Sequence, residues 1–114
     1  MHSIDIDLED TVKTIDERGF VIVPNVISSE LADQARNLIH GYLEAEASPG
    51  THQAKTQRVG QLAVKHQLFR DLMCHPTVLA VWERFLGSDF YCSTWSANTS
   101  YPGFDSIGWH VDYP

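Results

Sequence analysis

Two side chains near the C-terminal end of the sequence have the types and the spacing that a metal site needs. His110 and Asp112 are separated by one residue, and on a β-strand residues i and i+2 project from the same face. An imidazole nitrogen and a carboxylate oxygen presented together supply two corners of a metal site. One further histidine completes the 2-His-1-carboxylate arrangement that binds Fe(II) and leaves positions open. The motif is short, so a surface or capping histidine beside a carboxylate is the alternative.

A basic stretch is the second feature that could take part in binding or catalysis. Residues 47–70 contain no Asp or Glu but carry Lys55, Arg58, Lys65 and Arg70, in a chain with a net charge of -7. Grouped positive charge attracts anions, so the stretch is a candidate cradle for an anionic small molecule. A solvated basic loop and strand is the alternative. The remaining histidines lie in helical, loop or terminal segments and are expected to be structural or exposed: His2, His40, His52, His66 and His75.

The elements that must position these residues are helices first and strands later. Apolar spacing followed by Gly19 predicts a helix over 8–18, and Ser28 is a good N-cap for the clearest helix, which ends near residue 45. Shorter helices are expected over 67–73 and from Pro76 to a stop at Gly87. Strands are predicted over 20–23, 90–101 and 107–112, and a loop begins at 48–51. This order indicates an α+β fold with an incomplete sheet.

Length and composition exclude several classes of protein. The 114 residues, 43% hydrophobic and 20% charged, fit a single globular domain over 1–114. The acidic balance argues against nucleic-acid and anionic-membrane partners, because both need a basic surface. No apolar run approaches the ~20 residues of a transmembrane helix, and the acidic N-terminus is unlike a secretory signal. Two cysteines are too few for a disulfide framework, so we expect reduced thiols in a cytoplasmic protein.

Four segments, taken in order, resemble the phytanoyl-CoA dioxygenase family of Fe(II)/2-oxoglutarate oxygenases. Residues 19–28 look like the family's opening strand and the start of its first long helix, and residues 68–72 with His75-Pro76 follow. Residues 79–87 look like the helix that ends in Leu-Gly, and residues 109–114 look like the iron motif. The resemblance implies helices packed outside a double-stranded β-helix, a cupin-like jelly roll, of which this chain holds only the first strands.

The resemblance also implies a reaction and a set of site residues. His110 and Asp112 would be two ligands of Fe(II), and 2-oxoglutarate and O2 would be cosubstrates in the hydroxylation of a small-molecule C–H bond, with release of succinate and CO2. Asp112 indicates a hydroxylase, since related halogenases carry a small residue in its place. Arg58 and Ser96 would contact 2-oxoglutarate, with Asn98 two residues further along the same face as Ser96.

The family also requires a distal histidine and an arginine that anchors 2-oxoglutarate, both downstream of the iron motif. The sequence ends at Pro114, and a jelly roll needs about eight strands, so we expect the N-terminal part of a longer oxygenase that is inactive alone. Two alternatives stay open: a non-catalytic binding or regulatory module of the same fold, and a metal enzyme whose missing ligand comes from a partner chain. The substrate and the oligomeric state are left open.

Overall fold

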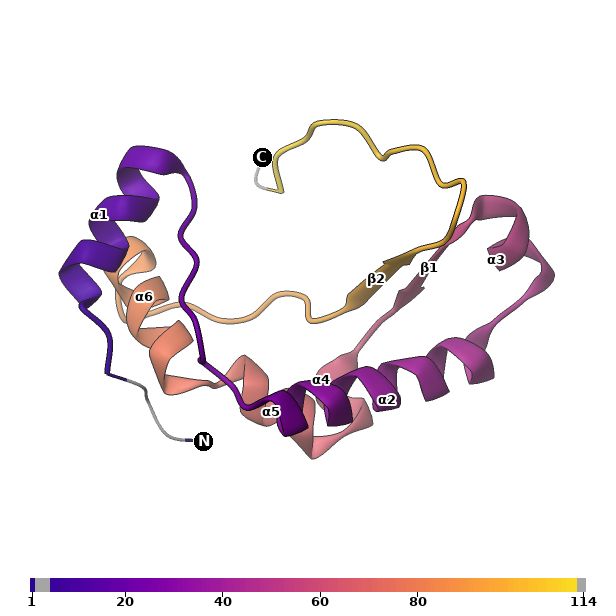
Figure 1. Ribbon diagram of the computed structural model, residues 1–114, viewed down its shortest axis with the longest axis horizontal. Helices are drawn as coiled ribbons and strands as arrows, with labels where there is room; N and C mark the ends of the chain where they lie inside the picture. Colours follow the sequence, from indigo (N-terminus) through magenta and orange to yellow (C-terminus); the bar gives the residue numbers. More distant parts are fainter. Residues whose placement is uncertain (2–4, 113–114) are drawn as a thin grey trace.

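The structure, a computed structural model, describes residue 1 and residues 5–112 of the chain (Figure 1). His2, Tyr113 and Pro114 lie outside these residues. In chain order the elements are α1 (Leu8–Arg18), α2 (Ser29–Glu46), α3 (Pro49–Ala54), β1 (Thr56–Val59), α4 (Leu62–Lys65), α5 (Gln67–Met73), α6 (Pro76–Leu86) and β2 (Ala97–Ser100). Helices and a small antiparallel sheet make this an α+β fold, as expected.

The longer helices begin and end where their capping residues predict. The Ser28 hydroxyl accepts a hydrogen bond from the Leu31 amide at 3.1 Å, so it satisfies one of the free donors at the start of α2. Gly19 ends α1 in the left-handed conformation, with a φ of 83° that glycine adopts at little cost. Pro76 takes the first position of α6, and Gly87 follows its last residue.

Four sequence expectations are wrong or too broad among the described residues. Residues 20–23 and 107–112 form no strand, and the expected strand over 90–101 narrows to β2. No neighbouring strand pairs with the first two segments, and Gly108 departs from extended backbone with a φ of 79°. The loop expected at 48–51 is instead the start of α3, because Pro49 presets a helical φ at the first position.

The sheet has two strands, and its two faces differ in chemistry. β1 and β2 are antiparallel, with Arg58 opposite Asn98 and Val59 opposite Ala97. Gln57 and Val59 are buried on the face that α2 packs against, whereas Arg58 is exposed on the other face. Figure 1 shows α2 running along one side of the strand pair only. One face of the sheet therefore belongs to the core, and the other is open.

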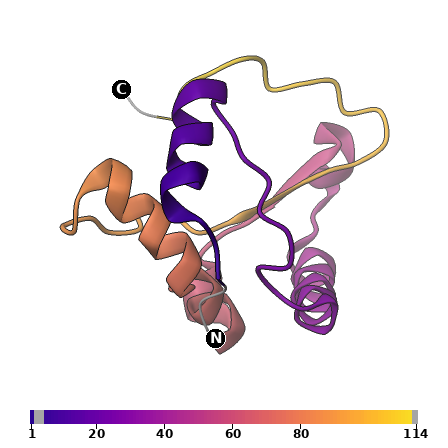
Figure 2. The same cartoon turned by 60° about the vertical axis from the view of Figure 1, so that its left-hand side comes forward.

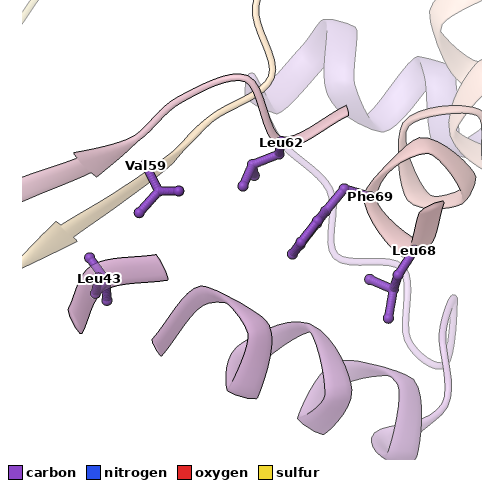
Figure 3. Packing of buried hydrophobic residues seen from close by; sticks show 5 residues of the cluster. All are labelled: Leu43, Val59, Leu62, Leu68 and Phe69. Carbon is purple, nitrogen blue, oxygen red and sulfur yellow. The ribbon is translucent and has the colours of Figure 1, made fainter. Parts of the chain in front are cut away.

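The core lies between α2, the buried face of the sheet and the short helices that follow it. Figure 3 shows its five buried apolar side chains pointing toward one another: Leu43, Val59, Leu62, Leu68 and Phe69. The first and the last helix also pack against each other: α1 lies beside α6 (Figure 2), and Arg84 of α6 pairs with Glu9 of α1. Within residue 1 and residues 5–112, no helix is long and apolar enough to cross a membrane.

Candidate functional site

His110 and Asp112 meet near the C-terminal end of the described chain. The Nε2 atom of His110 lies 3.3 Å from Oδ1 of Asp112, and both side chains are substantially exposed. The two residues lie in an irregular segment rather than on a strand, so a bend in the backbone brings them together. The expected pairing of the side chains is present, although the expected strand is not.

The histidine ring is oriented by a second contact. Its Nδ1 atom lies 3.1 Å from the Gly108 carbonyl oxygen, which can only accept, so Nδ1 carries the proton of this bond. In the neutral ring Nε2 then presents a lone pair toward the carboxylate of Asp112. Two such acceptors face each other favourably only when a proton or a cation lies between them. An Nδ1–H bond to a backbone carbonyl is also the usual support of a metal-binding imidazole.

The pair fits two positions of a metal site. Ligands on neighbouring corners of an octahedral ion, with bonds of ~2.1 Å, lie ~3 Å apart, close to the 3.3 Å observed between Nε2 and Oδ1. Imidazole nitrogen with carboxylate oxygen is the donor set of non-haem Fe(II) sites. Among residues 5–112, no third His, Cys, Asp or Glu joins the two to make a group of three.

The open face of the sheet carries the residues expected to contact the cosubstrate. Arg58 and Asn98 are direct cross-strand neighbours, and the Arg58 Nε–H donates to Asn98 Oδ1 at 2.9 Å. Asn98 and Ser100 are exposed on β2. Ser96 lies two residues before Asn98, the spacing of residues that share one face of a strand. This bond fixes the direction of the guanidinium and leaves its terminal N–H groups available to an anion.

Arg58 and Ser96 also share a cavity. Its volume is about 630 Å³, and it lies between β1, α4, the end of α5 and the segment before β2. The walls are Arg58, Gly60, Gln61, Ala63, Val64, Met73, Cys92, Ser93, Thr94, Trp95 and Ser96. Neither His110 nor Asp112 lines this cavity, and in both Figure 1 and Figure 2 the C-terminal segment arches away from the sheet. The structure thus brings His110 together with Asp112, and Arg58 together with Asn98 and Ser96. It does not place the first group beside the second.

The basic stretch does not form one cradle. Lys65 pairs with Glu46 and lies over the Tyr42 ring. Arg70 is held by Gln67 and by the carbonyl of Ala63. Lys55 lines a different cavity from Arg58, beside His52 and Tyr101. Of the four basic residues, Arg58 is therefore the one that faces the cavity described above.

Two residues of this cavity were missed by sequence reasoning. Trp95 donates its indole N–H to the Phe69 carbonyl at 3.0 Å, and its own carbonyl accepts from the Leu62 amide at 3.0 Å, so it forms a rigid wall. Gln61 follows Gly60 at the end of β1 and has a φ of 54°. The glycine after the apolar end of a strand was the signal available for this turn. The two cysteines are free and exposed.

Comparison with known proteins now adds a family. The family model for phytanoyl-CoA dioxygenase (PhyH) matches residues 15–114. The chain is 29% identical over 93 residues to Dioxygenase olcK of Penicillium canescens, covering 73% of this chain and 31% of that protein. It is 29% identical over 115 aligned positions to Dioxygenase af480 of Aspergillus fumigatus, covering 94% of this chain and 37% of that protein.

The chain thus spans about a third of the length of these curated relatives. No solved structure matches it significantly. The family model covers far more than half of the chain, and it includes α2, both strands and the His110–Asp112 pair. The chain belongs to the phytanoyl-CoA dioxygenase family.

Proposed function

We propose that this chain contributes to an Fe(II)- and 2-oxoglutarate-dependent oxygenase that hydroxylates a C–H bond of a small molecule. Family membership supports an oxygenase. The observation that carries the finer proposal is the oriented His110–Asp112 pair, with a donor separation of 3.3 Å. When bound, Fe(II) with 2-oxoglutarate and O2 supplies the oxidant for the C–H bond, and succinate and CO2 are released.

In this proposal His110 and Asp112 hold the metal ion. The Gly108 carbonyl keeps the proton on Nδ1 and so keeps Nε2 free to bind the ion. Asp112 supplies the negative charge that offsets part of the ion's charge. The third ligand of a 2-His-1-carboxylate site would come from outside residues 5–112, since no third donor joins the pair within them.

Arg58, Ser96 and Asn98 hold 2-oxoglutarate in this proposal. Arg58 binds a carboxylate through its terminal N–H groups, while Asn98 keeps the guanidinium in place through its 2.9 Å bond to Nε. Ser96 borders the same cavity and offers a hydroxyl. The proposal requires the segment that follows β2 to bring His110 and Asp112 over the open face of the sheet, as in the strand pairing of a jelly roll, because a metal-bound cosubstrate must reach Arg58.

Manganese tests the metal site directly. Mn(II) stands in for Fe(II) without being oxidised, and it broadens the NMR signals of nearby nuclei even when binding is weak. We expect selective broadening of the backbone signals of residues 108–112 in the 114-residue chain. His110→Ala and Asp112→Ala should each abolish it. His40→Ala is the matched control, because His40 is an exposed histidine on α2 and should leave the broadening unchanged.

A second titration tests the cosubstrate site. 2-Oxoglutarate should shift the signals of Arg58, Ser96 and Asn98, and Arg58→Gln should weaken its binding ~10-fold or more, the usual scale for losing one charge-assisted hydrogen bond. Broadening that persists in the His110→Ala/Asp112→Ala double variant contradicts the metal assignment. Uptake of neither Mn(II) nor 2-oxoglutarate is the outcome expected both for the non-catalytic module and for an oxygenase that needs its third metal ligand from outside this chain.

A further inference from the structure

The cavity beside Arg58 extends well past the residues expected to contact 2-oxoglutarate. Its volume of about 630 Å³ lies in the range of sites for small organic ligands. Beyond Arg58 and Ser96, the walls continue through Gln61 and Val64 to Met73 at the end of α5. Trp95 closes one side and is held in place by its bond to the Phe69 carbonyl. The residues expected to contact 2-oxoglutarate thus form only part of the lining of a larger space.

Charge is confined to one residue of the lining. Arg58 is the one ionic side chain among the residues that line the cavity, and no acid lines it. Away from Arg58 the walls are apolar or carry hydroxyl, thiol and amide groups. The cavity is open to solvent, since Gln61, Val64 and Thr94 are exposed. A charged group that packed against the apolar walls would give up part of its hydration there without gaining a partner of opposite charge. This part of the cavity therefore favours an uncharged molecule.

Gln61 is the residue best placed to orient such a molecule. Its backbone is left-handed, with φ 54° and ψ 40°, a conformation uncommon for a side chain of this type. The carbonyl of Gln61 accepts from the Val64 amide at 3.1 Å, whereas its exposed side-chain amide makes no hydrogen bond to another described residue. Unfavourable backbone conformations recur where a side chain is aimed at a ligand.

We infer that this cavity binds the substrate as an uncharged, largely apolar small molecule, with the Gln61 side-chain amide hydrogen-bonded to an oxygen on it. Calling this molecule the substrate rests on the function proposed above, whereas its binding to the cavity does not. Gln61 is then a specificity-determining residue, because it selects for an oxygen at one position of an otherwise apolar body. Amines and carboxylates of the same shape bind more weakly to this part of the cavity.

Three rigid probes with one shape and different charges test the inference. The probes 1-adamantanol, 1-adamantanecarboxylate and 1-adamantylammonium share one hydrocarbon cage. With 2-oxoglutarate present in excess to occupy Arg58, we expect adamantanol to shift the indole N–H signal of Trp95 and the side-chain amide signals of Gln61. The carboxylate and the ammonium should bind at least ~fivefold more weakly, since neither finds a partner of opposite charge.

Two glycine variants separate the side chain of Gln61 from its backbone conformation. Gln61→Gly keeps a positive φ and removes the amide, so adamantanol binding should weaken ~fivefold, the equivalent of about one hydrogen bond. Lys55→Gly is the matched control, because Lys55 also has a φ of 54° but lines the other cavity. Both variants replace a left-handed residue by glycine, and a shift in melting temperature shared by both reports only that change.

The outcomes separate this inference from the proposed function. Adamantanol binding that is equal in the wild type and in Gln61→Gly overturns the role of Gln61. Adamantylammonium that binds as tightly as adamantanol overturns the uncharged class of ligand. Arg58→Gln should weaken 2-oxoglutarate binding far more than adamantanol binding, because the alcohol carries no charge for the guanidinium to pair with. Retained adamantanol binding in a chain that takes up no Mn(II) contradicts the metal assignment of His110 and Asp112 and still supports the cavity assignment.

Discussion

Two histidines of this chain are used to begin helices rather than to do chemistry. The Nδ1 atom of His75 accepts from the Thr77 amide at 3.2 Å at the start of α6, and the Nδ1 atom of His66 accepts from the Leu68 amide at 3.0 Å at the start of α5. They differ in burial, since His75 is 2% exposed and His66 is exposed. The Nε2 atom of His75 also lies 3.1 Å from the Val26 carbonyl, which ties α6 to the segment that enters α2.

This difference in burial predicts a difference in stability. His75→Ala removes the cap, opens a space in a buried position and leaves the Val26 carbonyl without its donor, so we expect a loss of about 3 kcal/mol of unfolding free energy. His66→Ala removes an exposed cap alone and should cost about 1 kcal/mol. His75→Asn restores a good cap without the reach to Val26 and should fall between them.

Urea denaturation of the three variants measures these differences. Equal losses in His75→Ala and His66→Ala would contradict the importance of the Val26 contact.

A side chain from β1, rather than a residue next to α2 in the sequence, provides a hydrogen-bond donor to the C-terminal end of α2. The last four carbonyls of a helix have no partner within the helix, and Leu43 carries the first of these in α2. Ala47 follows the helix in extended conformation, and the last turn has no basic residue. Instead, the buried Gln57 of β1 donates its Nε2–H to the Leu43 carbonyl at 3.0 Å, and its Oε1 accepts from the Tyr101 hydroxyl at 2.8 Å. One amide joins α2, β1 and the residue after β2.

Replacing this amide should therefore affect three segments together. We expect Gln57→Leu to lower the free energy of unfolding by about 2 kcal/mol, because the carbonyl of the buried Leu43 and the hydroxyl of the half-buried Tyr101 lose their partner. Tyr101→Phe removes only one of the two bonds. It also removes the hydroxyl itself, so no donor is left without a partner, and the variant should cost about 1 kcal/mol or less. Chemical denaturation followed by circular dichroism measures both values. A larger loss in Tyr101→Phe than in Gln57→Leu would contradict the central place of Gln57.

Helices were predictable from the sequence to the extent that their signals are local. Ser28, Pro76 and the glycines at 19 and 87 act on backbone groups within a few residues, and α1, α2, α5 and α6 lie close to their expected bounds. A strand needs a partner, and the apolar run 20–23 has none, so its β-propensity is not realised. The pairing of Arg58 with Asn98 joins residues that are 40 positions apart in the sequence, which no local pattern reports.

The molecule as a whole is more open than a compact domain of its size. Its radius of gyration is 16.3 Å, against about 13 Å for a compact chain of 114 residues. Its accessible surface is 8841 Å², against about 6,300 Å² expected from its mass. The excess includes large apolar side chains at several places, among them Ile22, Tyr91, Ile107, Trp109 and Val111. These side chains are available for packing against further protein.

The exposed apolar surface predicts how the 114-residue chain behaves alone. We expect sedimentation velocity to show association that grows with concentration, because the uncovered side chains bury one another. Salt should strengthen this association, since the net charge of -7 opposes it and is screened. Ile107→Ser with Val111→Ser should weaken it at little cost in stability, because both side chains lie outside the core. Gln34→Ser is the control, because Gln34 is exposed and its replacement leaves the net charge unchanged. A monodisperse monomer with a cooperative melting transition at every concentration would show that the open faces are tolerated in water.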